Sequence, residues 1–389
     1  MITRVRARNF RSLRDVDFTL GPLNVLVGPN MGGKSNVLDL FRFLHQCWFP
    51  QAATFGPGNA LTQRQGIDEV LWKGSQDRLL SISIEFRETA RPGREFAYEL
   101  EIVGGAGGYF TIQNETLTLR EGSKDHRLIV RDDNGRWLVN VDQSKLVNVQ
   151  AERSGMEMAP LNWDGYPLKL FAQNWRFHQF VPAVMKQANP MTAGNILDLH
   201  GSNLSAWLMW LQTKSPQSFA RIAEVARDVF PEIRDLLTWP TQQGTVYLAS
   251  NEQGLLRPTP LFQMSDGELA FIAYLSLILS PDELGGTLIL IEEPENHLHP
   301  KLIETLVALL RQVQQEVADR GVPRSQIVLT THSLLVIDEM KIEEILWIAK
   351  KQGETKVIRP NDKPHLRKLV EDEELGLGDL MFAGALGEE

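Results

Sequence analysis

The chain has 389 residues, 43% of them apolar, and a formal net charge of −9. That length allows two or three folding units, and the acidic balance gives no global electrostatic case for nucleic-acid binding. Cys47 is the only cysteine, which excludes an intrachain disulfide framework and a cysteine-rich zinc site. No signal-peptide core and no run of about 18 apolar residues occurs, so we expect a cytoplasmic protein without a membrane span.

The chain begins with a predicted strand in which arginines alternate with apolar residues. Arg4, Arg6 and Arg8 share one face of this strand, and Arg11 and Arg14 follow. One interpretation is the solvated face of an edge strand, because charged edges oppose aggregation. The others are a contact with the phosphate backbone of DNA or with a nucleotide.

A glycine-rich loop follows the short apolar run Leu23–Val27. The sequence from Gly28 to Ser35, GPNMGGKS, matches the pattern G-x-x-x-x-G-K-[ST] and opens a predicted helix. In such a loop, backbone N–H groups converge on phosphate oxygens at the positive end of a helix. Lys34 would reach the β- and γ-phosphates and Ser35 would hold Mg²⁺. The alternative is a glycine turn that binds no ligand. The residues expected to bind the nucleotide here are Asn30, Gly32, Gly33, Lys34, Ser35 and Asn36.

The middle of the chain changes from irregular to strand-like and then to helical. Residues 51–75 read as irregular around Gly56-Pro57-Gly58-Asn59, whereas residues 79–142 alternate with period two. Together with the turn Asp133-Asn134-Gly135, this alternation predicts an antiparallel β layer. Residues 195–237 are predicted to be helical, with Pro216 and Pro231 as interruptions.

Strand–helix alternation returns over residues 260–348 and predicts a parallel sheet. The expected division is an N-terminal lobe over 1–78, the β layer over 79–165, a helical insertion over 166–258 and a C-terminal lobe over 259–389. Within the last lobe, Ser265 and Glu268 have the spacing of a capping box at a helix start. The same helix N-terminus, with Ser265 and Gly267, is also suited to a phosphate. The two interpretations are compatible.

Four further segments resemble motifs of one family. Met264–Glu268 resembles a variant of the ABC-ATPase signature Leu-Ser-Gly-Gly-Gln, with Met264, Asp266 and Glu268 as departures. Glu292–Pro300 resembles the Walker B motif and D-loop of SMC-, RecF- and OLD-like ATPases. Ile327–Ser333 resembles the family's switch strand, and Asn9–Leu13 its first-strand signature. Asp198–Leu204 and Leu375–Leu380 are similar to the same group with less specificity. The whole chain most resembles stand-alone ABC-type ATPases of the AAA-21/RecF-like group.

This resemblance implies an α/β fold, a P-loop ABC-type ATPase head with a parallel core sheet, an antiparallel β layer and a helical insertion. It implies ATP and Mg²⁺ as ligands. Glu292 would hold Mg²⁺ together with Ser35, although many ABC proteins have Asp at the position of Glu292. The alternative for these acids is a solvated strand end before a turn. The residues implied to act in catalysis are Lys34, Glu293, which would orient or deprotonate water, and His332, which would sense the γ-phosphate.

The resemblance also implies a homodimer in which ATP lies between two copies. Ser265 and Gly267 would then cap the γ-phosphate held by the opposite subunit, and Arg11 would contact the nucleotide. Gln63 and Gln65 are candidates for the family's Q-loop glutamine. Met31 departs from the usual Gly or Asn and should face away from the phosphates. His297 and His299 suggest metal ligands, but no further ligands cluster with them in the sequence.

Three functional classes remain open from the sequence. The first is an ATP-driven dimer that acts on DNA or switches an effector, as in anti-phage defence or DNA repair. The second is the energy subunit of a transporter, which the spacing of about 260 residues between the phosphate loop and the acidic strand disfavours. The third is a nucleotide-gated scaffold with little turnover. OLD nucleases carry a Toprim domain after the ATPase, but residues 333–389 contain no Asp-x-Asp motif, so a nuclease would have to be a partner protein.

Overall fold

The structure is a computed structural model that divides into two compact units. The described residues are 1–50, 56–131, 137–139, 146–147, 151–160, 162–192, 194–280, 287–318, 325–364, 367–368 and 377–378. Unit 1 consists of Met1–Trp175 with Met340–Glu389, and unit 2 of Arg176–Glu339. The predicted turn Asp133-Asn134-Gly135 and most of Leu375–Leu380 lie outside the described residues.

An eight-stranded antiparallel sheet forms most of unit 1, in the order β2-β1-β4-β5-β6-β7-β8-β9. Buried and more exposed residues alternate along β4 and β5, which is the pattern of a sheet with one face in a core. The predicted antiparallel layer is therefore confirmed. Its strands are β1 (Ile2–Phe10), β2 (Leu13–Thr19), β4 (Leu79–Arg87), β5 (Arg94–Gly104), β6 (Phe110–Glu121), β7 (Lys124–Arg131), β8 (Trp137–Val139) and β9 (Leu146–Val147).

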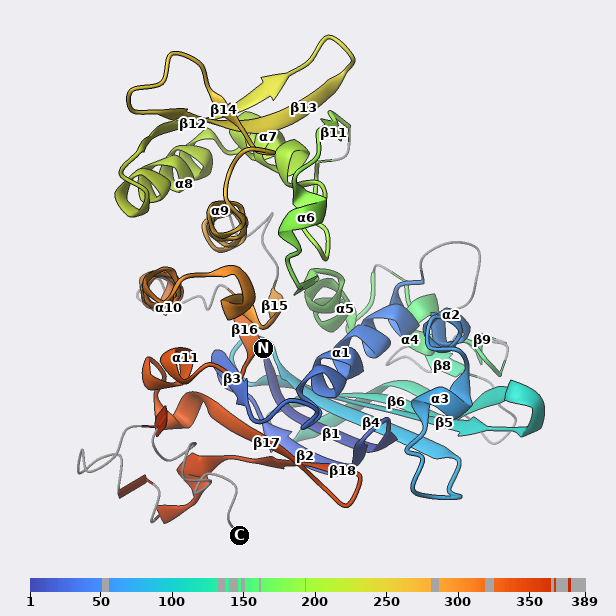
Figure 1. Cartoon of the computed structure of the whole chain (residues 1–389). Coiled ribbons are helices and arrows are strands. Elements are labelled where there is room, and N and C mark those ends of the chain that lie inside the picture. Colours follow the sequence, from blue (N-terminus) through green and yellow to red (C-terminus); the bar gives the residue numbers. More distant parts are fainter. Residues whose placement is uncertain are drawn as a thin grey trace. The chain divides into compact units, whose positions relative to one another are not determined.

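Helices cover one face of this sheet (Figure 1). The long α1 (Lys34–Trp48) packs aromatic side chains against it, with Phe43 5.5 Å from Phe10 and Trp48 4.8 Å from Tyr98 between ring centroids. Burial of such large rings supplies much of the core's stability. The other helices of this unit are α2 (Gly56–Thr62), α3 (Ile67–Val70), α4 (Gly155–Met158), α5 (Tyr166–Gln173) and the 3₁₀ helices η1 (Ala106–Gly108), η3 (Ile342–Glu344) and η4 (Pro360–Asp362).

Three further strands of unit 1 place the glycine-rich loop. The strand β3 (Leu23–Val27) is buried throughout and pairs in parallel with β17 (Ile345–Lys351). A hairpin turn joins β17 to β18 (Glu354–Ile358). The C-terminal hairpin therefore lies beside the strand that leads into the loop, although more than 300 residues separate them in the sequence.

Unit 2 contains a parallel pair, β15 (Leu288–Glu292) and β16 (Gln326–Thr331). The strand β10 (Trp175–His178), which starts at the boundary between the units, precedes β15 in the strand order. All four residues Leu288–Ile291 are buried, as a parallel strand requires. The helices of this part are α6 (Pro182–Met185), α9 (Asp266–Ile278), η2 (Pro294–His297), α10 (Pro300–Ala318) and α11 (Leu334–Asp338).

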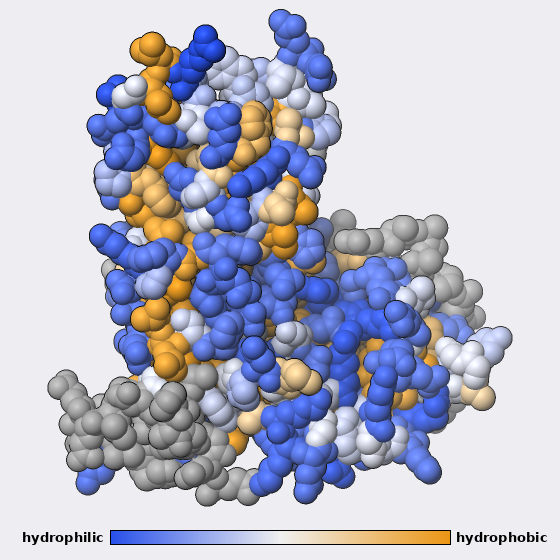
Figure 2. Space-filling model, in the orientation of Figure 1, coloured by the Kyte–Doolittle hydropathy of each residue, from blue (hydrophilic) through white to orange (hydrophobic). Residues whose placement is uncertain are grey.

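A second, smaller sheet stands at the other end of unit 2. It contains β11 (Asn189–Pro190), β12 (Ile233–Pro240), β13 (Thr245–Glu252) and β14 (Thr259–Pro260), and α7 (Leu204–Lys214) and α8 (Pro216–Val229) lie along it (Figure 1). Apolar side chains are exposed on this end (Figure 2), with Leu256 fully exposed and Trp239, Leu255 and Phe262 about half exposed. Such clusters on a surface are typical of contact sites for other molecules.

Three sequence expectations are corrected by the structure. Helix does not extend to residue 237, because α8 ends at Val229 and β12 begins two residues after Pro231, with Ile233 and Leu236 buried. The segment 166–258 therefore holds strands as well as helices. The segment around Gly56 is helical rather than irregular, because α2 packs closely against α1: a Cβ on Gly56 would lie 2.0 Å from the carbonyl oxygen of Cys47.

The third correction concerns the arginine-bearing strand. β1 pairs with β2 on one side and β4 on the other, so it is an interior strand and not an edge. Among the described residues, no helix is both long and apolar enough to cross a membrane.

Candidate nucleotide site

The glycine-rich loop lies against the C-terminal hairpin of unit 1. A Cβ on Gly28 would lie 1.9 Å from the carbonyl oxygen of Ile348, and one on Gly33 would lie 2.0 Å from Oγ1 of Thr355. Gly33 also has a φ of 109°, which favours glycine. The glycines thus allow the backbone to fold tightly over β17 and β18. Met31 (φ 64°) has a side chain that is 88% exposed, as expected for a residue that faces away from the loop's N–H groups.

The start of α1 has the properties of an anion site. Its N-cap, Gly33, provides no side-chain hydrogen bond, and the first turn contains no acidic residue. The partial positive charge of the helix end is therefore not neutralised by a carboxylate. Lys34 is buried, and its Nζ donates to the carbonyl oxygens of Gly28 at 2.7 Å and Pro29 at 3.1 Å. A phosphate bound here would receive hydrogen bonds that Lys34 now gives to the loop itself.

A buried chain of hydrogen bonds that the sequence did not predict holds this loop. Asn36 Nδ2 donates to Ser12 Oγ at 2.5 Å, Ser12 Oγ lies 2.7 Å from Thr355 Oγ1, and Thr355 Oγ1 donates to the carbonyl oxygen of Gly32 at 2.9 Å. The backbone N–H of Thr355 also donates to the carbonyl oxygen of Ser12. Because Ser12 and Thr355 are 343 positions apart, no local pattern could have revealed the contact.

Arg11 lies near the loop but already has a carboxylate partner. Its Nε is 2.7 Å from Oδ2 of Asp39 on α1, an ion pair without hydrogen-bond alignment, and Arg64 binds the same carboxylate at 2.6 Å. Gln63 and Gln65, the candidates for a Q-loop, are exposed; Gln63 bonds to Asn59 and Gln46. The role of Arg11 toward a nucleotide stays a prediction.

The arginine face of β1 is compensated by acids. Arg4 and Arg6 both contact Asp17, at 2.6 and 3.2 Å, and Arg8 contacts Asp77 at 3.3 Å. The hydrogen bond from Arg4 is the main reason that the pKa of Asp17 is lowered. Neutralised charges attract the phosphates of DNA less than free ones do, so this face gives little support for a DNA contact.

The acidic string of unit 2 places Glu293 at a strained turn. Glu293 follows β15 directly and has a φ of 44°, a left-handed conformation that costs a non-glycine residue about 1–3 kcal/mol. Its backbone N–H donates to the carbonyl oxygen of Thr330 at 3.1 Å. Its carboxylate accepts from Asn296 Nδ2 at 3.1 Å. The hydrogen bond from Asn296 thus holds one oxygen of the Glu293 carboxylate.

Glu295 contacts His332, the histidine that follows β16, and His332 also lies close to Glu293. His332 Nδ1 lies 3.5 Å from Glu293 Oε1 and 3.3 Å from Glu295 Oε1. Glu295 Oε1 also accepts from Thr331 Oγ1 at 2.7 Å and from the His332 N–H at 2.9 Å. Glu295 lies two positions after Glu293, and no motif in the sequence predicts its role. The structure shows that Glu295 fixes the position of the histidine beside Glu293.

The start of α9 is closed by the predicted capping box. Ser265 Oγ accepts from the N–H of Glu268 at 3.2 Å, and Glu268 Oε2 accepts from the N–H of Ser265 at 2.7 Å. A Cβ on Gly267 would lie 3.2 Å from the carbonyl oxygen of His297, so the start of α9 lies beside η2 within unit 2. A serine hydroxyl that accepts one bond still has its own hydrogen to donate. The cap therefore leaves Ser265 able to bind a phosphate oxygen.

The protein oxygens near the predicted site would hold Mg²⁺ only together with phosphate oxygens of a bound nucleotide. No group of three or more His, Cys, Asp or Glu side chains suited to a metal ion occurs in the described part of the chain, and His297 and His299 are exposed. Mg²⁺ commonly takes one or two protein oxygens and completes its shell with water and substrate phosphates. Ser35, at the start of α1, and Glu292, at the end of β15, each carry an oxygen of that type, and their role toward Mg²⁺ stays a prediction.

The segment Asp198–Leu204 has a structural explanation. Asp198 Oδ1 accepts from the N–H groups of Ser202 at 2.8 Å and His200 at 3.2 Å, and Asn203 Oδ1 accepts from the N–H of Asp198 at 3.0 Å. This turn leads into α7. The neighbouring His178 contacts the carbonyl oxygen of Asp198, and burial lowers the pKa of His178 to about 4.

Comparison with known proteins shows which family the chain resembles. Residues 23–338, most of the chain, match the family described as "AAA domain, putative AbiEii toxin, Type IV TA system". An OLD nuclease from Thermus scotoductus is 50% identical over 38 residues, 10% of this chain and 7% of that protein. A Vibrio cholerae protein described as "Retron Vc95 probable ATPase" is 32% identical over 114 residues, 27% of this chain and 21% of that protein. The matches thus span a small part of both relatives.

Solved structures show the same fold. An SMC head bound to the C-terminal winged-helix domain of ScpA is similar with a TM-score of 0.54 at 14% identity, over 92% of this chain and 97% of the other. An SMC head with an extended coiled coil, bound to the C-terminal domain of ScpA derived from Pyrococcus furiosus, has a TM-score of 0.55 at 13% identity, over 96% and 99%. The predicted ATPase-head fold is confirmed. The chain belongs to this AAA domain family, and its fold is that of an SMC head.

Proposed function

We propose that the chain binds ATP with Mg²⁺ at the glycine-rich loop and hydrolyses it with Glu293 as the residue that orients water. The start of α1, which has a glycine N-cap, no acid in its first turn and the buried Lys34, supports the binding half of this proposal. Lys34 would exchange the carbonyl oxygens of Gly28 and Pro29 for phosphate oxygens. Bound Mg²⁺, held by Ser35 and Glu292, would neutralise phosphate charge.

The arrangement at the end of β15 supports hydrolysis. Asn296 holds one oxygen of Glu293, which leaves the other to accept a hydrogen bond from water. His332 lies beside that second oxygen, at 3.5 Å, and its backbone N–H is fixed by Glu295. In this position His332 would report on the γ-phosphate, and its contact with Glu293 would connect the nucleotide state to the position of the base.

We further propose that ATP joins two copies of the chain in a symmetric dimer. The free hydroxyl hydrogen of Ser265 at the start of α9 supports this assignment. In a dimer, Ser265 and Gly267 of one copy would contact the γ-phosphate held by the other, and the interface would repeat by two-fold symmetry. Because ADP lacks the γ-phosphate, only ATP would favour the dimer.

We propose that this dimer switches an effector protein, with a nuclease as one class of partner. The relatives include an OLD nuclease and a retron ATPase, and the small sheet of unit 2 exposes Trp239, Leu255, Leu256 and Phe262. An apolar surface suits a protein partner better than DNA. A transporter subunit and a scaffold with little turnover are the alternatives.

Subunit mixing tests the dimer. A Lys34→Ala subunit lacks the binding half, and a Ser265→Arg subunit lacks the capping half through bulk and position. Each variant alone should show little ATPase activity, whereas the mixture should regain part of it, because one composite site keeps both functional halves. Sedimentation of Glu293→Gln with saturating ATP should show a dimer that ADP does not support. A monomer under these conditions, or normal turnover by Ser265→Arg, contradicts the mechanism.

A further inference from the structure

A cavity of about 390 Å³ lies beside the first turn of α1, entirely within unit 1. Four segments form it: the turn between β1 and β2, the first turn of α1, α3 with the residues after it, and the end of β17 with the turn that follows. Its volume is in the range of small-molecule sites in proteins. Its lining includes Arg11, Ser12, Asn36, Trp72, Lys350 and Gln352.

The position of this cavity relates it to the glycine-rich loop. Asn36 lines the cavity and directly follows Ser35, the last residue of the loop motif. Ser12 lines it as well, and the buried chain of hydrogen bonds runs from Asn36 through Ser12 and Thr355 to Gly32 of the loop. If a ligand binds with its phosphates on the loop, the rest of that ligand can therefore reach this cavity.

Trp72 is the aromatic wall of the cavity, and it is held rigidly. Its indole Nε1 donates to the carbonyl oxygen of Gly353 at 3.3 Å, and its backbone N–H donates to Asn9 Oδ1 at 3.1 Å. The guanidinium of Arg14 lies 4.9 Å from the ring centroid. A Cβ on Gly74 would lie 2.2 Å from the ring, so only glycine at that position leaves room for this indole orientation. A fixed ring loses little entropy when a ligand stacks on it.

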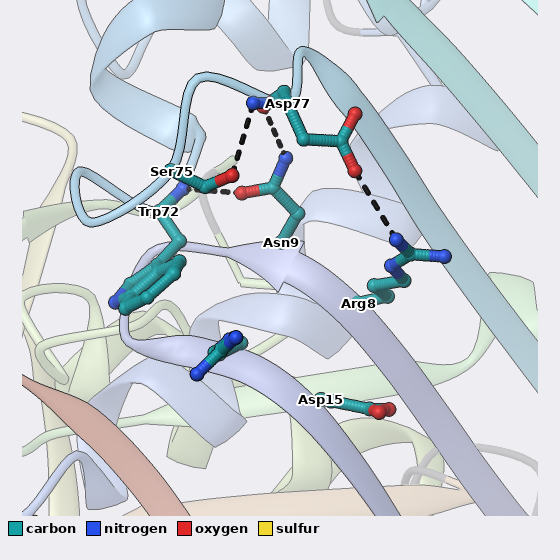
Figure 3. Close-up of a pocket in the computed structure, with 7 residues that line it drawn as sticks. Arg8, Asn9, Asp15, Trp72, Ser75 and Asp77 are labelled. Carbon is teal, nitrogen blue, oxygen red and sulfur yellow. Dashed lines mark hydrogen bonds and ion pairs between the residues drawn. The ribbon is translucent and has the colours of Figure 1, made fainter.

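Trp72 also borders a second cavity of about 220 Å³ (Figure 3), which is less suited to a nucleotide. Arg14 lines only this smaller cavity, so its guanidinium contacts the ring without lining the larger one. The cations here have acidic partners, Asp77 for Arg8 and Glu354 for Arg14, both at 3.3 Å, and Asp15 adds another acid. The smaller cavity thus has no excess positive charge for a phosphate-bearing ligand.

We infer that the larger cavity receives the base and ribose of the nucleotide, and that Trp72 is the surface on which the base stacks. Two further polar groups line the same cavity. They are the amide of Gln352, in the turn between β17 and β18, and the ammonium of Lys350, near the end of β17. This inference rests on the proposed ATP binding. It adds a specificity-determining residue that lies outside the phosphate loop.

The test compares ATP with inorganic tripolyphosphate, each with Mg²⁺, by calorimetry on the full chain. Tripolyphosphate carries the phosphates without base and ribose. Trp72→Ala should weaken ATP binding by about 5- to 100-fold, the range for loss of one base–aromatic stack, and leave tripolyphosphate binding unchanged. Trp72→Phe keeps a ring and should restore most of the affinity. Tyr109→Ala, which removes an exposed aromatic ring of unit 1 that lines neither cavity, is the control and should bind both ligands like wild type.

Distinct outcomes overturn the inference and the proposed function. If Trp72→Ala binds ATP as well as wild type does, the base lies elsewhere, and ATP binding itself stands. If Trp72→Ala and Trp72→Phe both lose ATP and tripolyphosphate to the same extent, Trp72 only supports the fold, and the inference is also wrong. If the wild type binds neither ligand, the proposed function fails. Thermal unfolding of each variant identifies one that does not fold, and in that case Trp72→Phe decides.

Discussion

Two helix N-termini of this protein resemble each other in the backbone and differ in their side chains. The start of α1 has a glycine N-cap without a side-chain bond and no acid in its first turn. The start of α9 is closed by Ser265 and Glu268 and carries Asp266 as well. Both ends have the partial positive charge of a helix, but only at α1 is that charge left without a carboxylate.

This difference separates two tasks that a helix end can perform. At α1 the first turn has no acid and the buried Lys34 lies beside it, which suits an anion that binds to one isolated chain. At α9 the acids oppose an approaching phosphate, and Asp266 is only partly compensated by Lys186 at 2.7 Å. What remains there is the hydroxyl hydrogen of Ser265. We therefore expect α1 to determine affinity for ATP and α9 to act only after ATP is bound.

The largest expected effect is on the hydrolysis step, which depends on neither helix end. Glu293→Gln should keep ATP binding by α1 and lower turnover by about 10²- to 10⁴-fold, the usual contribution of a general base. Steady-state ATPase assays and calorimetry measure the two quantities. Glu304→Gln, an exposed acid on α10, is the control. Equal turnover in Glu293→Gln and wild type would show that another residue orients the water.

The second prediction tests α1. Lys34→Ala should weaken ATP binding by about 10- to 100-fold, because a charged hydrogen-bond donor to the phosphates is lost. Calorimetry with Mg·ATP measures the affinity, and Lys124→Ala, an exposed lysine at the start of β7, provides the comparison. Unchanged affinity in Lys34→Ala would remove the distinction between the two helix ends.

The third prediction separates the cap at α9 from its contact with phosphate. Ser265→Asp keeps an N-cap acceptor but replaces the hydroxyl donor by a negative charge. It should unfold at the wild-type temperature, bind ATP normally and lose about 10-fold or more in ATPase activity, because like charges would face each other in the dimer. Ser265→Ala should instead lose about 1 kcal/mol of stability. If Ser265→Asp turns over ATP like wild type, the serine serves only as a cap.

The smallest effect concerns the support of α1. Thr355→Val keeps the shape of the side chain but removes the hydroxyl that bonds to Gly32 and Ser12, and we expect ATP binding to weaken about 3- to 10-fold because the loop loses this support. Thr355→Ser should restore the affinity. Thr305→Val, which loses an exposed hydroxyl on α10, controls for the substitution type. A lower unfolding temperature with unchanged ATP affinity would limit Thr355 to a structural role.

Features that depend on neighbouring residues were predictable from the sequence. The period-two alternation predicted over residues 79–142 follows from burial of one sheet face, and the structure confirms it along β4, β5 and β6. The capping box from Ser265 to Glu268 spans four residues, and both of its hydrogen bonds are present. The ATPase-head fold is confirmed as well. The roles of Lys34, Glu293 and His332 in chemistry stay predictions.

Contacts between distant residues were decided only by the tertiary structure. Thr355 meets Ser12 across 343 positions, Glu295 binds the backbone of His332, and Asp39 pairs with Arg11. β1 proved to be an interior strand, because β4 pairs with it from the far side of an intervening loop and helices. Sequence periodicity reports which face of an element is buried, since that depends on side-chain spacing within the element. It does not report which element covers that face, because the partner is selected by packing of the whole chain.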